Sequence, residues 1–383
     1  MKNEAIAFDG YVCETQDRSR FADELEAFSD VTSLQRGIMA NKLRVFPCPS
    51  PLETGMSAYS KIQEDTLENS KLCAAYDGDE YFVRDCGVLS IAAVGAKIMG
   101  AGLGDTLTKN ISDFCSGLNC FLTNRRSGDN CCLIVRGGKL TAMHGSNYEY
   151  MPQAELYSLL EEKLNSPMYG GTRFVHGCIT HEMTNALLLL DRREITEAYR
   201  KIREDIGAVY IGEFSCGVVF ETSDVSTSAV DVRPVFVDIH TGAVTSFCEG
   251  IKIPHILSKN GSGLERLGAE LDKGILLTMF EDTLDKIRAL GSIRIEHPEN
   301  TVVSLCNRYG IARKWGELAR AAVEAFTRLT AYDIYAFMAN IVPQAKLLGA
   351  SEGTLITLES AIYKIVYADW NDHDHGGTVA WKK

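Results

Sequence analysis

A stretch of alternating residues from Glu213 to His255 limits the folds open to this chain more than any other part of the sequence. Between Phe214 and Phe220 every second residue is apolar, and this period of two is typical of a strand that buries one face. Ser223–Asp224 interrupts the pattern, which resumes at Val230. The stretch therefore predicts a sheet built from consecutive strands.

The second apolar run changes parity in its middle. Val230 and Val232 share one parity and Val235–Ile239 follows the other, with the switch at Arg233–Pro234. Proline has no N–H to donate, so it belongs at a sheet edge or a bulge, and a one-residue flip predicts a β-bulge. The stretch ends near Cys248, which this pattern places in the core and not at a nucleophilic site.

The 383 residues exceed the size at which a single core stops growing, about 250–300 residues, so we expect two domains. Strand patterns dominate up to Lys259–Gly261, and helical spacing dominates beyond it. The sequence predicts an α+β body over residues 1–260, with a mixed, largely antiparallel sheet and packed helices, followed by an all-helical domain over residues 261–383. The expected elements include a hairpin over Phe174–Leu190, a helix over Leu89–Met99, a helix capped by Asp105 or Thr106, a long helix over Leu264–Leu284, and a helix over Tyr332–Leu348 kinked at Pro343.

Composition and charge narrow the possible partners. No apolar segment approaches the ~18 residues of a membrane span, and the first residues lack a signal-peptide pattern, so we expect a cytoplasmic protein with reduced cysteines. Residues 251–383 carry equal numbers of basic and acidic side chains, so residues 1–250 hold the whole net charge of −12. Such a surface does not attract nucleic acid nonspecifically, although a local basic patch would.

Three blocks of sequence follow one another in an order found in a known family. They are Ala92–Leu164, with the hairpin Leu133–Gly138 and the segment His144–Pro152; Thr222–Val230 together with Cys248–Gly250; and Tyr309–Ala339, with Thr330–Tyr335. Together they resemble the phage/plasmid-like protein family, also called domain of unknown function 932. Glu249 stands where that family usually has asparagine. The resemblance implies a phage, prophage or plasmid origin and supplies no catalytic residues.

One candidate anion-binding site lies where the strands give way to the long helix. His255, Lys259 and Ser262 precede this helix. A helix N-terminus offers free N–H groups and the positive end of the helix dipole, which suit phosphate or carboxylate. A capped linker between the domains is the other reading of the same residues.

A second candidate is a nucleic-acid contact in the helix-to-hairpin region. Arg125, Arg126, Arg136 and Lys139 are close in sequence there. If they fold together, they form a basic patch on an acidic body. The alternative is a solvated hairpin end.

Other motifs give less. His373 and His375 lie in a cluster of ligand-type side chains near the end of the chain, and they are weak metal candidates because neighbouring residues in one segment rarely complete a site. His181–Asn185 begins like a zinc-protease helix but has asparagine where the second histidine is required. Gly100–Gly104 follows a helical run and reads as helix termination. No cofactor motif is recognisable, and no metal is expected.

These observations favour an accessory protein of a phage, prophage or plasmid that acts by binding a nucleic acid or a host protein. An enzyme that acts on a nucleotide or nucleic acid at the domain junction is the first alternative, although the sequence contains no complete catalytic motif. A self-assembling structural component is the second alternative.

Overall fold

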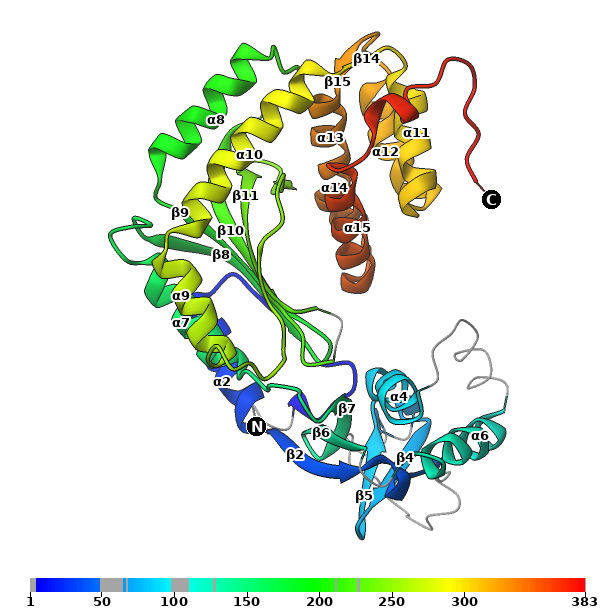
Figure 1. Cartoon of the computed structure of the whole chain (residues 1–383). Coiled ribbons are helices and arrows are strands. Elements are labelled where there is room, and N and C mark those ends of the chain that lie inside the picture. The colour runs from blue at the N-terminus through cyan, green and yellow to red at the C-terminus, as the bar shows by residue number, and fades with distance from the viewer. Residues whose placement is uncertain are drawn as a thin grey trace.

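The chain folds into two antiparallel or mixed sheets with packed helices, followed by a largely helical region (Figure 1). The computed structural model describes residues 5–48, 65–66, 68–97, 110–126, 129–210, 212–225 and 228–382, with the side chain of residue 352 left out. The α+β class predicted from the sequence is confirmed. None of the described helices is both long enough and apolar enough to cross a bilayer.

The large sheet is antiparallel throughout the described residues. Its order is β1-β8-β9-β10-β11-β12, with β13 also paired to β11. The strands are β1 (Val12–Thr15), β8 (Thr172–Thr180), β9 (Thr184–Leu190), β10 (Phe214–Thr222), β11 (Val230–Asp238), β12 (Val244–Thr245) and β13 (Ile251–Ile253). The predicted hairpin over Phe174–Leu190 is confirmed as β8–β9.

The small sheet has the order β2-β6-β7-β5-β4-β3, and only β5 and β7 run parallel. Its strands are β2 (Thr32–Met39), β3 (Arg44–Pro47), β4 (Leu72–Tyr76), β5 (Asp79–Val83), β6 (Asn130–Arg136) and β7 (Lys139–Gly145). It packs with α4 (Asp85–Ser90), a π-helical turn over Ile91–Gly95, and α6 (Ile111–Thr123). Asn110 caps α6; the predicted caps Asp105 and Thr106, and Gly100–Gly104, lie outside the described residues.

Helices cover one face of the large sheet (Figure 1). They are α2 (Arg18–Asp30), α7 (Gln153–Leu164), α8 (Arg193–Asp205), α9 (Gly263–Asp272) and α10 (Ile275–Ser292). The predicted long helix over Leu264–Leu284 is divided between α9 and α10, because Gly274 adopts a left-handed conformation with φ of 72°.

The C-terminal region continues with α11 (Pro298–Tyr309), α12 (Arg313–Val323), α13 (Ala331–Ala339), α14 (Ile341–Leu347) and α15 (Glu352–Ile365). It is not all-helical, since β14 (Arg294–Ile295) pairs with β15 (Leu329–Thr330). The predicted kink at Pro343 is replaced by a break at Asn340. Pro343 is the third residue of α14, where its missing N–H costs no helical hydrogen bond.

The apolar cores divide the chain differently from the boundary predicted near residue 260. One continuous core joins the large sheet to helices on both sides of that boundary, from Ile6 to Trp370. A separate core belongs to the small sheet, from Ile38 to Met143. The change at residue 260 therefore marks a switch from strand to helix within one packed body.

The predicted bulge at Arg233–Pro234 is wrong. The register between β10 and β11 is continuous, and Val218 lies opposite Pro234. The parity changes because both faces of β11 are buried: Val232 packs in the main core, whereas Val235 packs in a cluster on the other face. Pro234 lies on the outer edge of β11, in the gap between the residues that pair with β13 and with β12.

Candidate functional site

The structure does not assemble the predicted anion site as an open cradle. His255 is buried between two groups of the protein: its Nδ1 is 3.2 Å from the carbonyl oxygen of Glu149, and its Nε2 is 3.3 Å from the Thr222 hydroxyl. Burial lowers the pKa of His255, which favours the neutral ring. Lys259 is exposed, whereas His255 is buried, so these two residues do not form the single site that the sequence predicted.

The N-terminus of α9 already holds two carboxylates of the protein. Ser262 and Glu265 form a capping box, in which the Ser262 N–H donates to the Glu265 carboxylate at 2.8 Å. The Gly263 N–H donates to the Glu149 carboxylate at 2.7 Å, and Arg266 donates to the same side chain. These N–H groups satisfy internal carboxylates, so the capped-linker reading describes the observed contacts of Ser262.

The four residues of the predicted nucleic-acid contact are not brought together at the surface. Arg136 is fully buried and donates to Asp224 at 2.5 Å, so no phosphate reaches its guanidinium. Lys139 is 4% exposed, and its Nζ lies 3.1 Å from an Asp9 oxygen. Arg125 is half-buried and paired with Asp129, and Arg126 is exposed. Arg136 and Lys139 therefore form buried ion pairs within the fold, and only Arg125 and Arg126 of the predicted patch lie near solvent.

His373 and His375 lie in a segment that packs along α11. The Nδ1 of His373 is 2.8 Å from the Ser304 hydroxyl, and Asn300 donates to the carbonyl oxygen of His375. Asp374 accepts from the N–H groups of Glu296 and His297 at 2.8 Å, just before α11 begins. Among the described residues, no three His, Cys, Asp or Glu side chains are grouped as a metal site.

Cys248 is a packed thiol, as its place in the sequence pattern indicated. The Thr283 hydroxyl donates to its Sγ at 3.2 Å, and the thiol lies 3.7 Å from the Met279 carbonyl oxygen. Burial raises the pKa of Cys248, so the reactive thiolate form is disfavoured.

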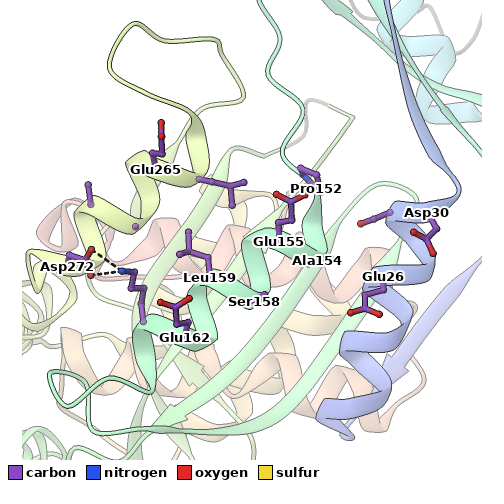
Figure 2. Close-up of a pocket in the computed structure, with 15 residues that line it drawn as sticks. Glu26, Asp30, Pro152, Ala154, Glu155, Ser158, Leu159, Glu162, Glu265 and Asp272 are labelled. Atoms are coloured by element: carbon purple, nitrogen blue, oxygen red, sulfur yellow. Dashed lines mark hydrogen bonds and ion pairs between the residues drawn. The ribbon is translucent and has the colours of Figure 1, made fainter.

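An open groove lies over α7, bounded by α2 on one side and α9 on the other (Figure 2). We call it the acidic groove; its volume is about 950 Å³. Its lining consists of Glu26, Ser29 and Asp30 of α2; Pro152, Ala154, Glu155, Ser158, Leu159, Glu162 and Lys163 at α7; and Leu264, Glu265, Gly268, Ala269 and Asp272 of α9. None of the sites predicted from the sequence lies in this groove.

Small residues of α7 and α9 contribute to the lining of the acidic groove. Ala154 and Ser158 lie on α7, and Gly268 and Ala269 lie on α9. A Cβ at Gly268 would lie 3.8 Å from the methyl groups of Leu159. Short side chains therefore form part of the groove lining, beside the larger Leu159 and Leu264.

Each helix contributes two carboxylates to the acidic groove. Glu155 and Glu162 are two helical turns apart on α7, and Glu265 and Asp272 have the same spacing on α9. On α2, Glu26 precedes Asp30 by one turn. The helical period therefore points each pair toward the same side of its helix.

Most of this negative charge is not neutralised by the protein. Lys163 is the basic residue of the lining, and it pairs with Asp272 at 2.8 Å. Glu26, Asp30 and Glu155 form no ion pair within the part of the chain that the structure describes. A groove with several unpaired carboxylates repels anions and attracts cations.

A sequence signal for the groove exists but is incomplete. Acidic residues seven positions apart on the polar faces of α7 and α9 are ordinary features of solvated helices. Their convergence depends on α2, α7 and α9 packing side by side, which is a tertiary arrangement. No family model, curated protein or solved structure matches this chain.

Proposed function

We propose that this protein acts by binding a partner protein, and that a basic helix of the partner lies in the acidic groove. The observation that carries the proposal is the set of six carboxylates that three helices contribute to the lining of one groove. The proposal is one form of the accessory binding role that the sequence favours, and the family resemblance adds only a phage, prophage or plasmid origin.

Charge favours a protein partner over a nucleic acid. Six carboxylates and one paired lysine line the groove, so a phosphate backbone would be repelled there. Two of the four cations once expected to contact nucleic acid, Arg136 and Lys139, are buried. Lysine and arginine side chains of a partner helix carry the positive charge that complements these carboxylates.

Shape favours a helix as the docked element. A helix with its side chains is about 10–12 Å across and rises about 5.4 Å per turn, so the volume of the groove corresponds to roughly two turns. This length agrees with the two-turn spacing between Glu155 and Glu162 and between Glu265 and Asp272. A basic side chain on each successive turn of the partner would therefore meet a carboxylate.

Reversing the charge on α7 tests this proposal. We expect Glu155→Lys/Glu162→Lys to weaken binding of an alanine-rich helical peptide with lysines along one face by about tenfold or more, because two attractive contacts become repulsive. Affinity of the unaltered protein should fall with rising salt. Fluorescence anisotropy of the labelled peptide measures both effects.

The matched control is Glu281→Lys/Glu324→Lys, which makes the same change in net charge at exposed positions outside the groove. It should bind the lysine peptide nearly as well as the unaltered protein, and a glutamate version of the peptide should not bind. Equal weakening by both double variants would show that net charge alone attracts the peptide. Tight, salt-sensitive retention of duplex DNA would instead favour the nucleic-acid alternative.

A further inference from the structure

A second hollow lies on the opposite face of the large sheet, between the sheet and the C-terminal helices. We call it the junction cavity; its volume is about 370 Å³, within the range of roughly 300–1,000 Å³ typical of small-molecule sites. Its lining includes residues of β8, β9, β10, β11 and β12 on one side and of α13, α14 and α15 on the other. It shares no lining residue with the acidic groove and does not depend on the function proposed for that groove.

The middle of the junction cavity is apolar on both walls. The sheet supplies Val175, Leu187, Val219, Val235, Val237 and Val244. The helices supply Val342, Leu355, Ile356 and Ile362, together with the rings of Tyr335 and Tyr363. Val235 and Val237 are the residues after the parity change in β11, and both line the cavity. The parity change in the sequence therefore coincides with the strand segment that faces the cavity.

The charged groups at one end of the cavity are neutralised by one another. Arg233 donates to Asp231 at 3.1 Å and to Glu221 at 3.3 Å, and its guanidinium lies 5.3 Å from the centre of the Tyr363 ring. Burial opposes the charge of Arg233, but Asp231, Glu221 and Glu359 together raise its pKa above the usual value. An anionic ligand would have to compete with these carboxylates for the guanidinium.

The cations at the other end are also engaged. The Nε2 of His176 lies 2.8 Å from a Glu14 oxygen, and Lys346 pairs with the same carboxylate. The tyrosine hydroxyls are occupied as well, since Tyr335 donates to the Ser246 carbonyl oxygen and Tyr363 to that of Cys248. Polar groups that already have partners favour a ligand without charge.

Asn185 differs from these polar groups, and it is less exposed than Gln16, the other lining amide without a hydrogen bond to the described residues. It lies on β9 opposite Glu221, and its side-chain amide makes no hydrogen bond with the described residues. An amide has two donors and an acceptor, so it suits one polar group on an otherwise apolar molecule.

We propose that the junction cavity binds an uncharged, mainly apolar small molecule that places one hydrogen-bonding group at Asn185. The apolar walls supply the binding energy through burial, and Asn185 sets the orientation. Arg233 and Lys346 are each paired with carboxylates of the protein, so they are not available to bind a negatively charged ligand.

Two related dyes test this proposal on the full chain. N-phenyl-1-naphthylamine is uncharged and has one N–H donor, and 8-anilinonaphthalene-1-sulfonate has the same aromatic framework with a negative charge. We expect the uncharged dye to bind saturably at one site, about tenfold or more tighter than the sulfonate. Asn185→Leu should weaken the uncharged dye several-fold. Fluorescence titration gives each dissociation constant.

Two cavity-filling variants locate the dye. Val219→Trp fills the cavity from the sheet, and Ile356→Trp fills it from α15, so each should weaken the uncharged dye about tenfold or more. Val12→Trp at an exposed site on β1 should leave binding unchanged. The two substitutions lie on opposite walls of the cavity. If one variant misfolds, as judged by its circular-dichroism spectrum, the variant that folds normally decides the test. Unchanged affinity in a folded filling variant, no saturable binding, or tighter binding of the sulfonate would each overturn the proposal.

Discussion

Replacing Arg136 with methionine is expected to lower the free energy of unfolding by about 3–5 kcal/mol, the usual cost of leaving one member of a buried ion pair without its partner. Arg136 is fully buried, and its partner Asp224 is 1% exposed. The second oxygen of the Asp224 carboxylate has no hydrogen-bond partner among the described residues, so loss of the guanidinium would leave a poorly compensated charge. Urea denaturation at neutral pH measures the change.

The effect should be large because Arg136 joins separate parts of the fold. From β6 of the small sheet, it donates to the His181 carbonyl oxygen at 3.1 Å, in the turn between β8 and β9 of the large sheet. It also donates to Thr32 of β2, and its guanidinium lies 4.0 Å from the centre of the Phe28 ring in α2. Methionine can replace the packing but none of these hydrogen bonds.

Two further variants separate the ion pair from general disruption. Arg126→Met removes an exposed arginine and should change stability by less than about 0.5 kcal/mol. Arg136→Met/Asp224→Leu removes both charges and should be more stable than Arg136→Met alone, because no unpaired carboxylate remains. A double variant less stable than either single variant would indicate that these residues act through packing and not through charge.

The second large effect is a loss of stability in mild acid. Burial lowers the pKa of His181 from 6.5 to about 3. The unfolded chain therefore takes up a proton at this residue as the pH falls through 6.5, whereas the folded chain does not until about pH 3. Between these values His181 should reduce the free energy of unfolding by up to about 1.4 kcal/mol per pH unit as the pH falls.

The contacts of His181 explain why its charged form is disfavoured. Its Nε2–H donates to the Phe8 carbonyl oxygen at 2.8 Å, but its buried Nδ1 has no partner in the part of the chain that the structure describes. A second proton would have no acceptor, and the cations of Arg84 and Arg136 also oppose it. Burial lowers the pKa of His144 and His255 as well, so these residues add to the same trend.

Urea unfolding at pH 7, 6 and 5 should show this decline, and the variant His181→Gln isolates one contribution. Glutamine can keep a donor toward Phe8 but takes up no proton. The variant should be less stable than the unaltered protein at pH 7, with a shallower loss toward pH 5. Parallel pH profiles for the two proteins would mean that protonation of His181 is not coupled to folding.

The sequence predicted elements whose signals are local. The hairpin predicted over Phe174–Leu190 is an example, since two apolar runs flank the polar residues Thr180–Glu182. Pro234 shows the limit of this reasoning. Alternation assumes one buried face, whereas helices cover one face of β11 and the junction cavity lies over the other.

The sites depended on contacts between distant residues, which the sequence does not reveal. Arg136 and Asp224 are 88 positions apart, and an arginine near a hairpin turn is ordinarily a surface residue. Likewise, the helix end at Ser262 looked free because its second carboxylate partner, Glu149, is 114 positions from Gly263. Buried charge pairs and the convergence of three helices become visible only once the fold is known.

Pro234 also affects whether β11 can pair with a strand of another molecule. Strand pairing along the outer edge of β11 is interrupted. The pairing with β13 ends at Val232, and the pairing with β12 begins at Phe236. An uncovered strand edge invites pairing with a strand of another molecule. Proline presents no N–H in that gap, and its carbonyl oxygen already accepts from the Ser246 hydroxyl at 3.2 Å. Pro234 is itself buried, so this gap offers an incoming strand neither a backbone donor nor a free acceptor for edge-to-edge pairing.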